Sequence, residues 1–209
     1  MTLLLLSLFA LDVPDQAIES LEDVAAPDPG ESAYATCGGC HGAQGQGNPA
    51  MNAPALAGQD ADYTARQLRN YKAGIRGADP EDVYGAQMRG MSNVLIEDAA
   101  VVAVSEYIAT LERPSAAATT ATQAELSAGQ SAYMNCVSCH GQNGQGNPVM
   151  MGPALAGLDA PYVERQLEHF RAGRRGAHTE DAWGASMVPL AKQLDAETSV
   201  AIAAYLTSL

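Results

Sequence analysis

The stretch TCGGCHGAQGQGNP, residues 36–49, returns later in the chain as NCVSCHGQNGQGNP, residues 135–148. Each copy contains the motif Cys-x-x-Cys-His, and the two motifs together use all four cysteines of the chain. A glycine-rich run that ends in Asn-Pro follows each motif. The pattern therefore predicts two equivalent sites, each with two thiols and one imidazole.

The repeat extends well beyond these motifs. Residues 30–88 align with residues 129–187 without a gap, and more than half of the aligned residues are identical. Similarity of this extent indicates an internal duplication. We expect one domain at residues 30–112 and a second at residues 126–209, joined by an Ala- and Thr-rich linker at residues 113–125.

Residues 1–29 precede the repeat. The apolar run Leu3–Leu11 is shorter than the roughly 20 residues that a helix needs to span a bilayer, and no Lys or Arg precedes it. The segment Asp12–Glu31 is acidic and contains no basic residue. We interpret residues 1–29 as an export segment, a membrane anchor or a linker. Packing of the apolar run on the body of the protein or on a neighbouring subunit is the alternative.

Composition and charge restrict the class of protein. Of the 209 residues, 47% are hydrophobic, which is enough to build packed cores. The chain has 24 acidic residues and 11 Lys and Arg residues, giving a formal net charge of −13. Binding to phosphate backbones needs clustered cations, so nucleic acid is excluded as an expected partner.

The local pattern within each copy is helical. Residues 60–73 and 159–172 place aromatic or amide side chains at i, i+4 and i+8, and each segment is followed by a glycine that ends a helix. Residues 32–40 and 131–139 approach the second cysteine of each motif without a helix breaker before the glycines. A third segment near the end of each copy places apolar residues along one helical face. No alternating apolar and polar run of strand length is present, so the predicted fold class is all-α.

Three familiar uses of Cys-x-x-Cys fit this chain poorly. A disulfide framework needs no His after each second Cys and is typical of smaller, cysteine-dense chains. A tetrahedral zinc site would have to take ligands from both domains to complete one ion. A thioredoxin-like redox pair is expected in a βαβ setting, which the helical pattern does not provide.

Covalent attachment of haem c fits both motifs. Two thiols on one helical turn reach the two vinyl groups of one porphyrin, and the adjacent His lies under the iron as its fifth ligand. Two such motifs at homologous positions of a duplication predict two haem groups.

The sixth ligand separates electron carriers from enzymes, because a Met thioether favours ferrous iron whereas an open position admits oxygen or peroxide. Met88 aligns with Met187, and both are expected in the loop before the last helix. Met91 aligns with a leucine. Met51 and Met150 also align, but they follow the Cys-x-x-Cys-His motif closely, in the loop expected on the His side. The repeat register therefore favours Met88 and Met187 as ligands, with core packing as the alternative role.

With these motifs the chain resembles the class I c-type cytochromes, and as a duplicated whole it resembles the di-haem cytochrome c4 family. The resemblance rests on CGGCHG and CVSCHG, on GQGNP and PALAG in both copies, on YTARQLRNYKAGIRG and YVERQLEHFRAGRRG, and on the late Met of each copy. It covers residues 30–209.

The resemblance implies one covalent haem c in each domain, bound through two Cys, one His and one Met. The implied cofactor-binding residues are Cys37, Cys40, His41, Met88, Cys136, Cys139, His140 and Met187, of which His41, Met88, His140 and Met187 bind the metal. It also implies that the carbonyls of Pro54 and Pro153 accept a hydrogen bond from the other imidazole nitrogen of each His, which fixes the ring orientation.

Several other residues have two interpretations. Four arginines recur in both copies and could bind haem propionates by bidentate hydrogen bonds or lie on a solvated helix face: Arg66, Arg76, Arg165 and Arg175. His169 and His178 have no counterpart in the first copy and are expected on the surface. Trp183, which aligns with Tyr84, is expected as an aromatic wall of the pocket.

The resulting hypothesis is a di-haem c-type cytochrome that carries single electrons between respiratory redox partners and is not itself an enzyme. The expected donor is a quinol-oxidising complex, and the expected acceptor is a terminal oxidase or reductase. The expected location is the periplasm or another extracytoplasmic space, with a membrane tether through the N-terminus as an option. Two alternatives remain open: a peroxidase-like di-haem enzyme with one open haem, and an electron-conduit subunit of a membrane complex or cytochrome assembly.

Overall fold

The computed structural model of the chain describes residues 26–115 and 119–209. The apolar run Leu3–Leu11 and most of the acidic leader lie outside the described residues. Within those ranges, no helix is both long and apolar enough to cross a membrane.

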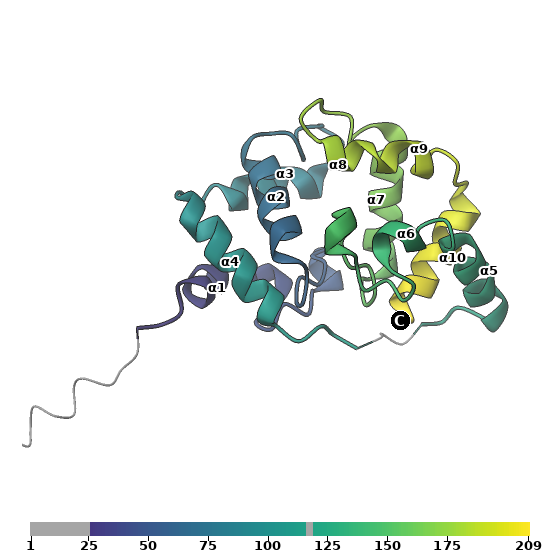
Figure 1. Cartoon of the computed structure of the whole chain (residues 1–209), viewed down its shortest axis with the longest axis horizontal. Coiled ribbons are helices and arrows are strands. Elements are labelled where there is room, and N and C mark those ends of the chain that lie inside the picture. The colour runs from purple at the N-terminus through teal and green to yellow at the C-terminus, as the bar shows by residue number, and fades with distance from the viewer. Residues whose placement is uncertain (1–25, 116–118) are drawn as a thin grey trace, which may run out of the picture.

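The two copies form two groups of helices placed side by side, and the described residues that follow α4 and precede α5 lie along one edge (Figure 1). The first group contains α1 (Pro29–His41), η2 (Pro49–Met51), α2 (Ala61–Lys72), α3 (Val83–Ser92) and α4 (Asp98–Thr110). The second contains α5 (Gln123–Tyr133), α6 (Val137–His140), η3 (Pro148–Met150), α7 (Ala160–Ala172), α8 (Ala182–Ala185), α9 (Met187–Ala191) and α10 (Ala196–Thr207). The described residues contain two isolated β-bridges and no β-strand. The all-α prediction is confirmed.

Aspartate side chains begin six of the ten α-helices in the described residues. Their carboxylates accept hydrogen bonds from backbone N–H groups in the first turn, where an α-helix leaves those donors without partners. The N-cap aspartates are Asp28, Asp60, Asp82, Asp159, Asp181 and Asp195. Part of the acidity of the chain therefore serves to define where its helices start.

Each domain is closed by contact between its first and last helices, and a glycine makes that contact possible. A Cβ at Gly30 would lie 2.3 Å from the carbonyl oxygen of Ala103, and one at Gly129 would lie 2.0 Å from that of Ala201. Next to the crossing, the rings of Tyr133 and Tyr205 pack with centroids 5.7 Å apart. The absent side chain lets the backbones of α5 and α10 approach closely.

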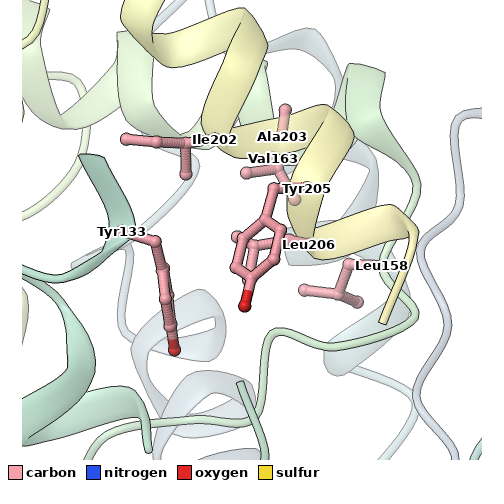
Figure 2. Packing of buried hydrophobic residues seen from close by; sticks show 7 residues of the cluster. All are labelled: Tyr133, Leu158, Val163, Ile202, Ala203, Tyr205 and Leu206. Carbon is pink, nitrogen blue, oxygen red and sulfur yellow. The ribbon is translucent and has the colours of Figure 1, made fainter. Parts of the chain in front are cut away.

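Apolar residues of the last helix form the centre of each core. In the second domain, Tyr133, Leu158, Val163, Ile202, Ala203, Tyr205 and Leu206 pack together (Figure 2). In the first, the equivalent cluster contains Tyr34, Ala65, Leu95, Val101, Val104 and Ile108. The apolar spacing that predicted the last helices therefore identifies the buried face.

The helix that leads to the Cys-x-x-Cys-His motif is continuous in the first copy and divided in the second. The sequence predicted one helix over residues 131–139, but α5 ends at Tyr133, and Cys136 N–H donates to the Tyr133 carbonyl at 2.7 Å in a tighter turn before α6 begins. At its start, α5 extends into the segment predicted as the linker, because Thr122 and Glu125 form a reciprocal capping box there.

The loop predicted around Met88 and Met187 was wrong, because both residues lie in helices. Met88 is in α3, and Met187 is the first residue of α9. Asp82 caps α3 through the N–H of Gly85 at 2.9 Å, so the segment before the last helix begins as helix. In the second copy the helix is divided into α8 and α9, as expected where Pro189 cannot donate to the carbonyl four residues earlier and its ring clashes with it.

Helices α2 and α7 lie on the two sides of the domain boundary (Figure 1), and two arginines link them. Arg76 donates to Gln67 Oε1 and to Gln166 Oε1, both at 2.8 Å. Arg175 donates to the same two oxygens, at 3.2 and 2.8 Å respectively. Both side chains are buried, with exposed fractions of 5% for Arg76 and 7% for Arg175. The solvated helix face is therefore the wrong interpretation for these two arginines.

Backbone groups of the two PALAG segments are linked across the same boundary. Gln59 Nε2 donates to the Ala154 carbonyl, and Ala154 N–H donates back to Gln59 Oε1, both at 3.0 Å. Arg113, which follows the first domain, donates to the carbonyls of Gly58 at 2.6 Å and Ala156 at 3.3 Å. The two domains are thus held together by buried polar contacts.

His169 belongs to this boundary, and its predicted surface position was wrong. Its exposed fraction is 6%, and its Nδ1 lies 3.6 Å from Oδ1 of the buried carboxylate Asp82 in the other domain. The symmetry-related pair is Asn70 with Asp181, whose side chains are 3.4 Å apart. The sequence placed His169 outside because its lack of a repeat partner was taken as a surface feature, whereas it reflects an asymmetric interface.

We expect Gly129→Ala to lower the free energy of unfolding by about 1–3 kcal/mol, because the new methyl group overlaps the Ala201 carbonyl and backbone has little room to move. Denaturant unfolding of the haem-loaded protein measures this change. The control is Gly90→Ala in the exposed part of α3, where a Cβ meets nothing within 4 Å and the substitution adds up to about 1 kcal/mol of helix stability. Equal effects of the two substitutions would contradict the close crossing.

We expect His169→Asn to weaken the pH dependence of stability. Burial of the imidazole lowers the pKa of His169, although Asp82 opposes this shift, so the unfolded chain binds a proton more readily than the folded one. The folded state of the natural chain should therefore lose stability as the pH falls below about 6.5, the ordinary His pKa. Denaturant unfolding between pH 7.5 and pH 5 should show a smaller loss in the variant. His178→Asn, at an exposed position, is the control and should leave the loss unchanged.

Candidate functional site

The two Cys-x-x-Cys-His motifs lie at corresponding places, where the first helix of each copy ends. Cys37 and Cys40 are in α1, and Cys136 and Cys139 are at the start and within α6. All four thiols are free of disulfide bonds. Burial raises the pKa of the Cys37 and Cys136 thiols. Neither thiol therefore has the lowered pKa that is typical of a redox-active or catalytic cysteine.

Both histidines are held by the hydrogen bond that the family resemblance implied. His41 Nδ1 lies 2.8 Å from the Pro54 carbonyl oxygen, and His140 Nδ1 lies 2.9 Å from the Pro153 carbonyl oxygen. Because a carbonyl only accepts, Nδ1 carries the proton and Nε2 keeps its lone pair. Burial also lowers the pKa of both imidazoles, which keeps them neutral. A neutral imidazole with a fixed ring and a free Nε2 is suited to bind a metal.

The glycine-rich runs turn the chain tightly after each His. Gly47 has a φ of +85°, and a Cβ there would lie 2.6 Å from the backbone nitrogen of Ala55. Its counterpart Gly146 has a φ of +87° and the same close approach, 2.8 Å, to Ala154. The turn brings Pro54 in the first domain, and Pro153 in the second, back against the imidazole.

A cavity of about 560 Å³ lies in the second domain between the His140 side and the α9 side. It is lined by Cys136, Cys139, His140 and Met187, together with apolar side chains such as Leu155, Val163, Phe170 and Leu206. Its size and predominantly apolar lining are typical of cofactor sites. The predicted thiols, imidazole and thioether of the second site therefore share one cavity.

Aromatic and apolar side chains from both domains complete the wall of this cavity. Trp183, predicted as an aromatic wall, lines it. Met150, which the sequence did not favour as a ligand, and Leu190, the counterpart of Met91, also line it. The cavity wall is completed by residues of the first domain, among them Tyr63 and Arg66.

The arginines leave buried nitrogen atoms without partners. Within the described residues, these are Nε and Nη1 of Arg66, Nε of Arg165 and Nε of Arg175. A buried donor without an acceptor lowers the stability of the fold, so these atoms indicate that a bound molecule supplies the missing acceptors. The carboxylate oxygens of a haem are acceptors of the kind that guanidinium groups bind best.

The residues present fit a covalently bound haem c. The cavity offers two thiols, a neutral imidazole with a free Nε2, apolar walls for a porphyrin and cationic donors for propionates. When bound, haem c supplies one-electron exchange at its iron. The protein fixes the ligands, excludes water and provides the counter-charge.

Sequence reasoning missed the polar residues that link the two sites. Gln67, Gln166, Tyr63 and Tyr162 appeared only as positions of a helical period, yet their oxygen atoms accept hydrogen bonds from Arg76 and Arg175. The available signal was their identity in both copies, since a solvated helix face does not need the same polar residues at the same positions.

Comparison with known proteins gives a consistent result. The family model described as cytochrome c matches residues 27–112 and again residues 126–209. The chain is 32% identical over 191 residues to cytochrome c4 of Azotobacter vinelandii, covering 86% of this chain and 87% of that protein. It is also 32% identical over 183 residues to a thiosulfate dehydrogenase electron acceptor of Thiomonas intermedia (strain K12), covering 83% of this chain and 78% of that protein. The crystal structure of reduced recombinant cytochrome c4 from Pseudomonas stutzeri superposes with a TM-score of 0.72 at 31% identity, covering 88% of this chain and 99% of that one.

Proposed function

The chain belongs to the cytochrome c4 family of di-haem cytochromes c, and on that premise we propose that it relays single electrons from a quinol-oxidising complex to a terminal oxidase or reductase. It binds two covalently attached haem c groups and acts as a one-electron carrier. The observation that carries the proposed relay is the equivalence of the two sites. Each has the same Cys, His and Met set, so neither is built as a separate substrate site.

The proposed iron ligands are His41 with Met88 and His140 with Met187. The Nδ1 contacts to Pro54 and Pro153 support the imidazoles, because they orient both rings and increase their basicity. The shared cavity of His140 and Met187 supports the second pair, and the repeat register extends this support to the first. A soft thioether ligand favours ferrous iron and raises the reduction potential, which suits an electron acceptor of a respiratory chain.

We place the protein in the periplasm or another extracytoplasmic space, where c-type haem is attached after export. Residues 1–29 are the proposed export segment, tether or linker. The domains are proposed at residues 30–112 and 126–209, with the joining segment between them.

A second donor is favoured by one specific comparison. The Thiomonas intermedia relative is named as the electron acceptor of a thiosulfate dehydrogenase, and the chain matches it over most of its length. A thiosulfate-oxidising enzyme is therefore the alternative electron donor. Stopped-flow reduction of the di-haem protein by each purified donor distinguishes the two.

The proposed function excludes the di-haem enzyme and keeps the electron-conduit subunit as a distinct outcome. An enzyme with one open iron would bind carbon monoxide readily in its ferrous form, whereas two Met-ligated irons would not. A conduit subunit would elute as a large assembly in size exclusion with light scattering. A protein that binds no carbon monoxide and has the mass of a single chain supports the mobile carrier.

We expect Met187→Ala to keep both covalent haem groups but to open the second iron. Carbon monoxide should then bind to one of the two ferrous haems, because alanine offers no ligand in place of the thioether. Absorption spectra with and without carbon monoxide measure this, and intact mass counts the haem groups. Met91→Ala, at a half-exposed position in α3, is the control and should bind none. An unchanged spectrum for Met187→Ala would remove Met187 from the ligand set.

We expect electron transfer to a basic redox partner to slow as salt rises. The net charge of −13 attracts a cationic surface over a distance that ions limit to about 10 Å at 0.1 M salt. Stopped-flow rates should fall roughly tenfold between low and physiological salt. Deleting residues 1–29 should reduce this slope if the acidic leader is the docking element and leave it unchanged if the domains are. A salt-independent rate in both forms would indicate apolar docking.

A further inference from the structure

The cavity of the second domain contains an arginine from the first. Arg66 lies on α2 of the first domain, but it lines the same cavity as Cys136, His140 and Met187. Its Nη2 donates to the Met151 carbonyl of the second domain at 3.3 Å. Its other two nitrogens, Nε and Nη1, are buried and have no acceptor. Arg66 therefore brings unpaired donors beside a site that belongs to the other half of the molecule.

Arg165 repeats this arrangement in the opposite direction. It lies on α7 of the second domain, and its Nη1 and Nη2 donate to Asn52 Oδ1 at 3.4 Å and to the Asn52 carbonyl at 3.3 Å in the first domain. Asn52 is the repeat counterpart of Met151. The guanidinium of Arg165 lies 4.6 Å from the ring centre of Tyr84, the counterpart of the cavity residue Trp183. Nε of Arg165 is buried without a partner.

The charge of this pair has no compensation in the described part of the chain. Neither Arg66 nor Arg165 forms an ion pair with a carboxylate there. Arg76 and Arg175 likewise form no ion pair there, but the glutamine and tyrosine oxygens of the boundary engage both guanidinium groups, which leaves only Nε of Arg175 without an acceptor. A guanidinium held near apolar walls needs an anion, and a carboxylate matches its planar donors.

We propose that the haem propionates are bound across the domain boundary: Arg66 of the first domain binds a propionate of the second haem, and Arg165 of the second domain binds one of the first. This proposal rests on the proposed function, because it requires one haem in each domain. Of the four arginines that recur in the repeat, it assigns this role to two. The other two hold the domains together. Each haem is then sensitive to a positioning residue of the opposite domain.

The cross-domain contact has a consequence for redox balance. A positive charge beside a haem favours the ferrous form, which carries one positive charge less at the iron. Arg66 should therefore raise the reduction potential of the second haem, although it belongs to the first domain. Arg165 should do the same for the first haem.

The test is Arg66→Gln in the full-length di-haem protein, which keeps a hydrogen-bond donor and removes the charge. Redox titration followed by NMR of the haem methyl signals reports each haem separately. The signals are assigned with the Cys136→Ala, Cys139→Ala variant, which carries only the first haem. We expect the second haem to shift toward the ferric form by on the order of tenfold, with little change at the first. Arg165→Gln should shift the first haem instead.

Arg69→Gln is the matched control, because Arg69 lies on the same helix but is exposed and paired with Asp98 at 2.7 Å. It should shift neither haem. A larger shift of the first haem in Arg66→Gln, equal shifts of both, or no shift would each overturn the cross-domain assignment. If Arg66→Gln fails to fold, Arg66→Lys retains the charge without the planar fork. Because the charge is kept, the second haem should stay close to its natural potential, and a shift of the first haem instead would count against the proposal.

Haem content and carbon monoxide binding are measured on the unmodified protein in the same series. Loss of a haem or an open iron there counts against the proposed function and its ligand set. The identity of the haem that responds to each arginine tests only the cross-domain contact, so the two failures are distinguishable.

Discussion

The crossing of the first and last helices at a glycine is the constraint on which each domain depends. Gly30 and Gly129 let backbone approach backbone so closely that a single methyl group would overlap a carbonyl. That contact places the end of the first helix, and with it the thiols and the imidazole, against the apolar face of the last helix. In the second domain the last helix contributes Ile202 and Leu206 to both the core and the cavity wall. The position of the site thus follows from the packing that makes the domain stable.

A second constraint fixes the two domains relative to each other. Arg76 and Arg175 are buried side by side, and both donate to the oxygens of Gln67 and Gln166, which are neutral. Two like charges in this setting repel, and neutral acceptors offset this only in part. The arrangement is more favourable when anions lie nearby, which is what propionates would supply. Binding of the cofactors would therefore also stabilise the contact between the two domains.

The residues of the Cys-x-x-Cys-His motifs could be predicted from the sequence, because each position in one copy can be compared with its counterpart in the other. Cys37 and His41 recur as Cys136 and His140, and apolar spacing located the last helix of each copy. The helical position of Met88 was missed, since it depends on how Asp82 caps the segment, and a cap was not expected before a presumed loop. The cross-domain contacts were also out of reach, because a repeat reports the register within a copy and says nothing about how two copies meet. His169 shows this most clearly: it is buried beside Asp82 of the other domain, as its counterpart Asn70 lies beside Asp181, and no comparison within a copy indicates either contact.

The duplication has kept the proposed ligand sets of the two sites alike, while their surroundings have diverged. The boundary carries Gln59 in one copy and Leu158 in the other, and only Gln59 forms the reciprocal hydrogen bonds to Ala154, next to the proline that holds His140. Tyr84 in the first domain corresponds to Trp183 in the second, so the aromatic wall differs as well. Hydrogen bonding and solvent exposure around a haem set its reduction potential even when the axial ligands are the same. Two sites with one proposed ligand set and unequal surroundings would differ in reduction potential and so give an electron a preferred side of the molecule, as the proposed relay between two partners requires.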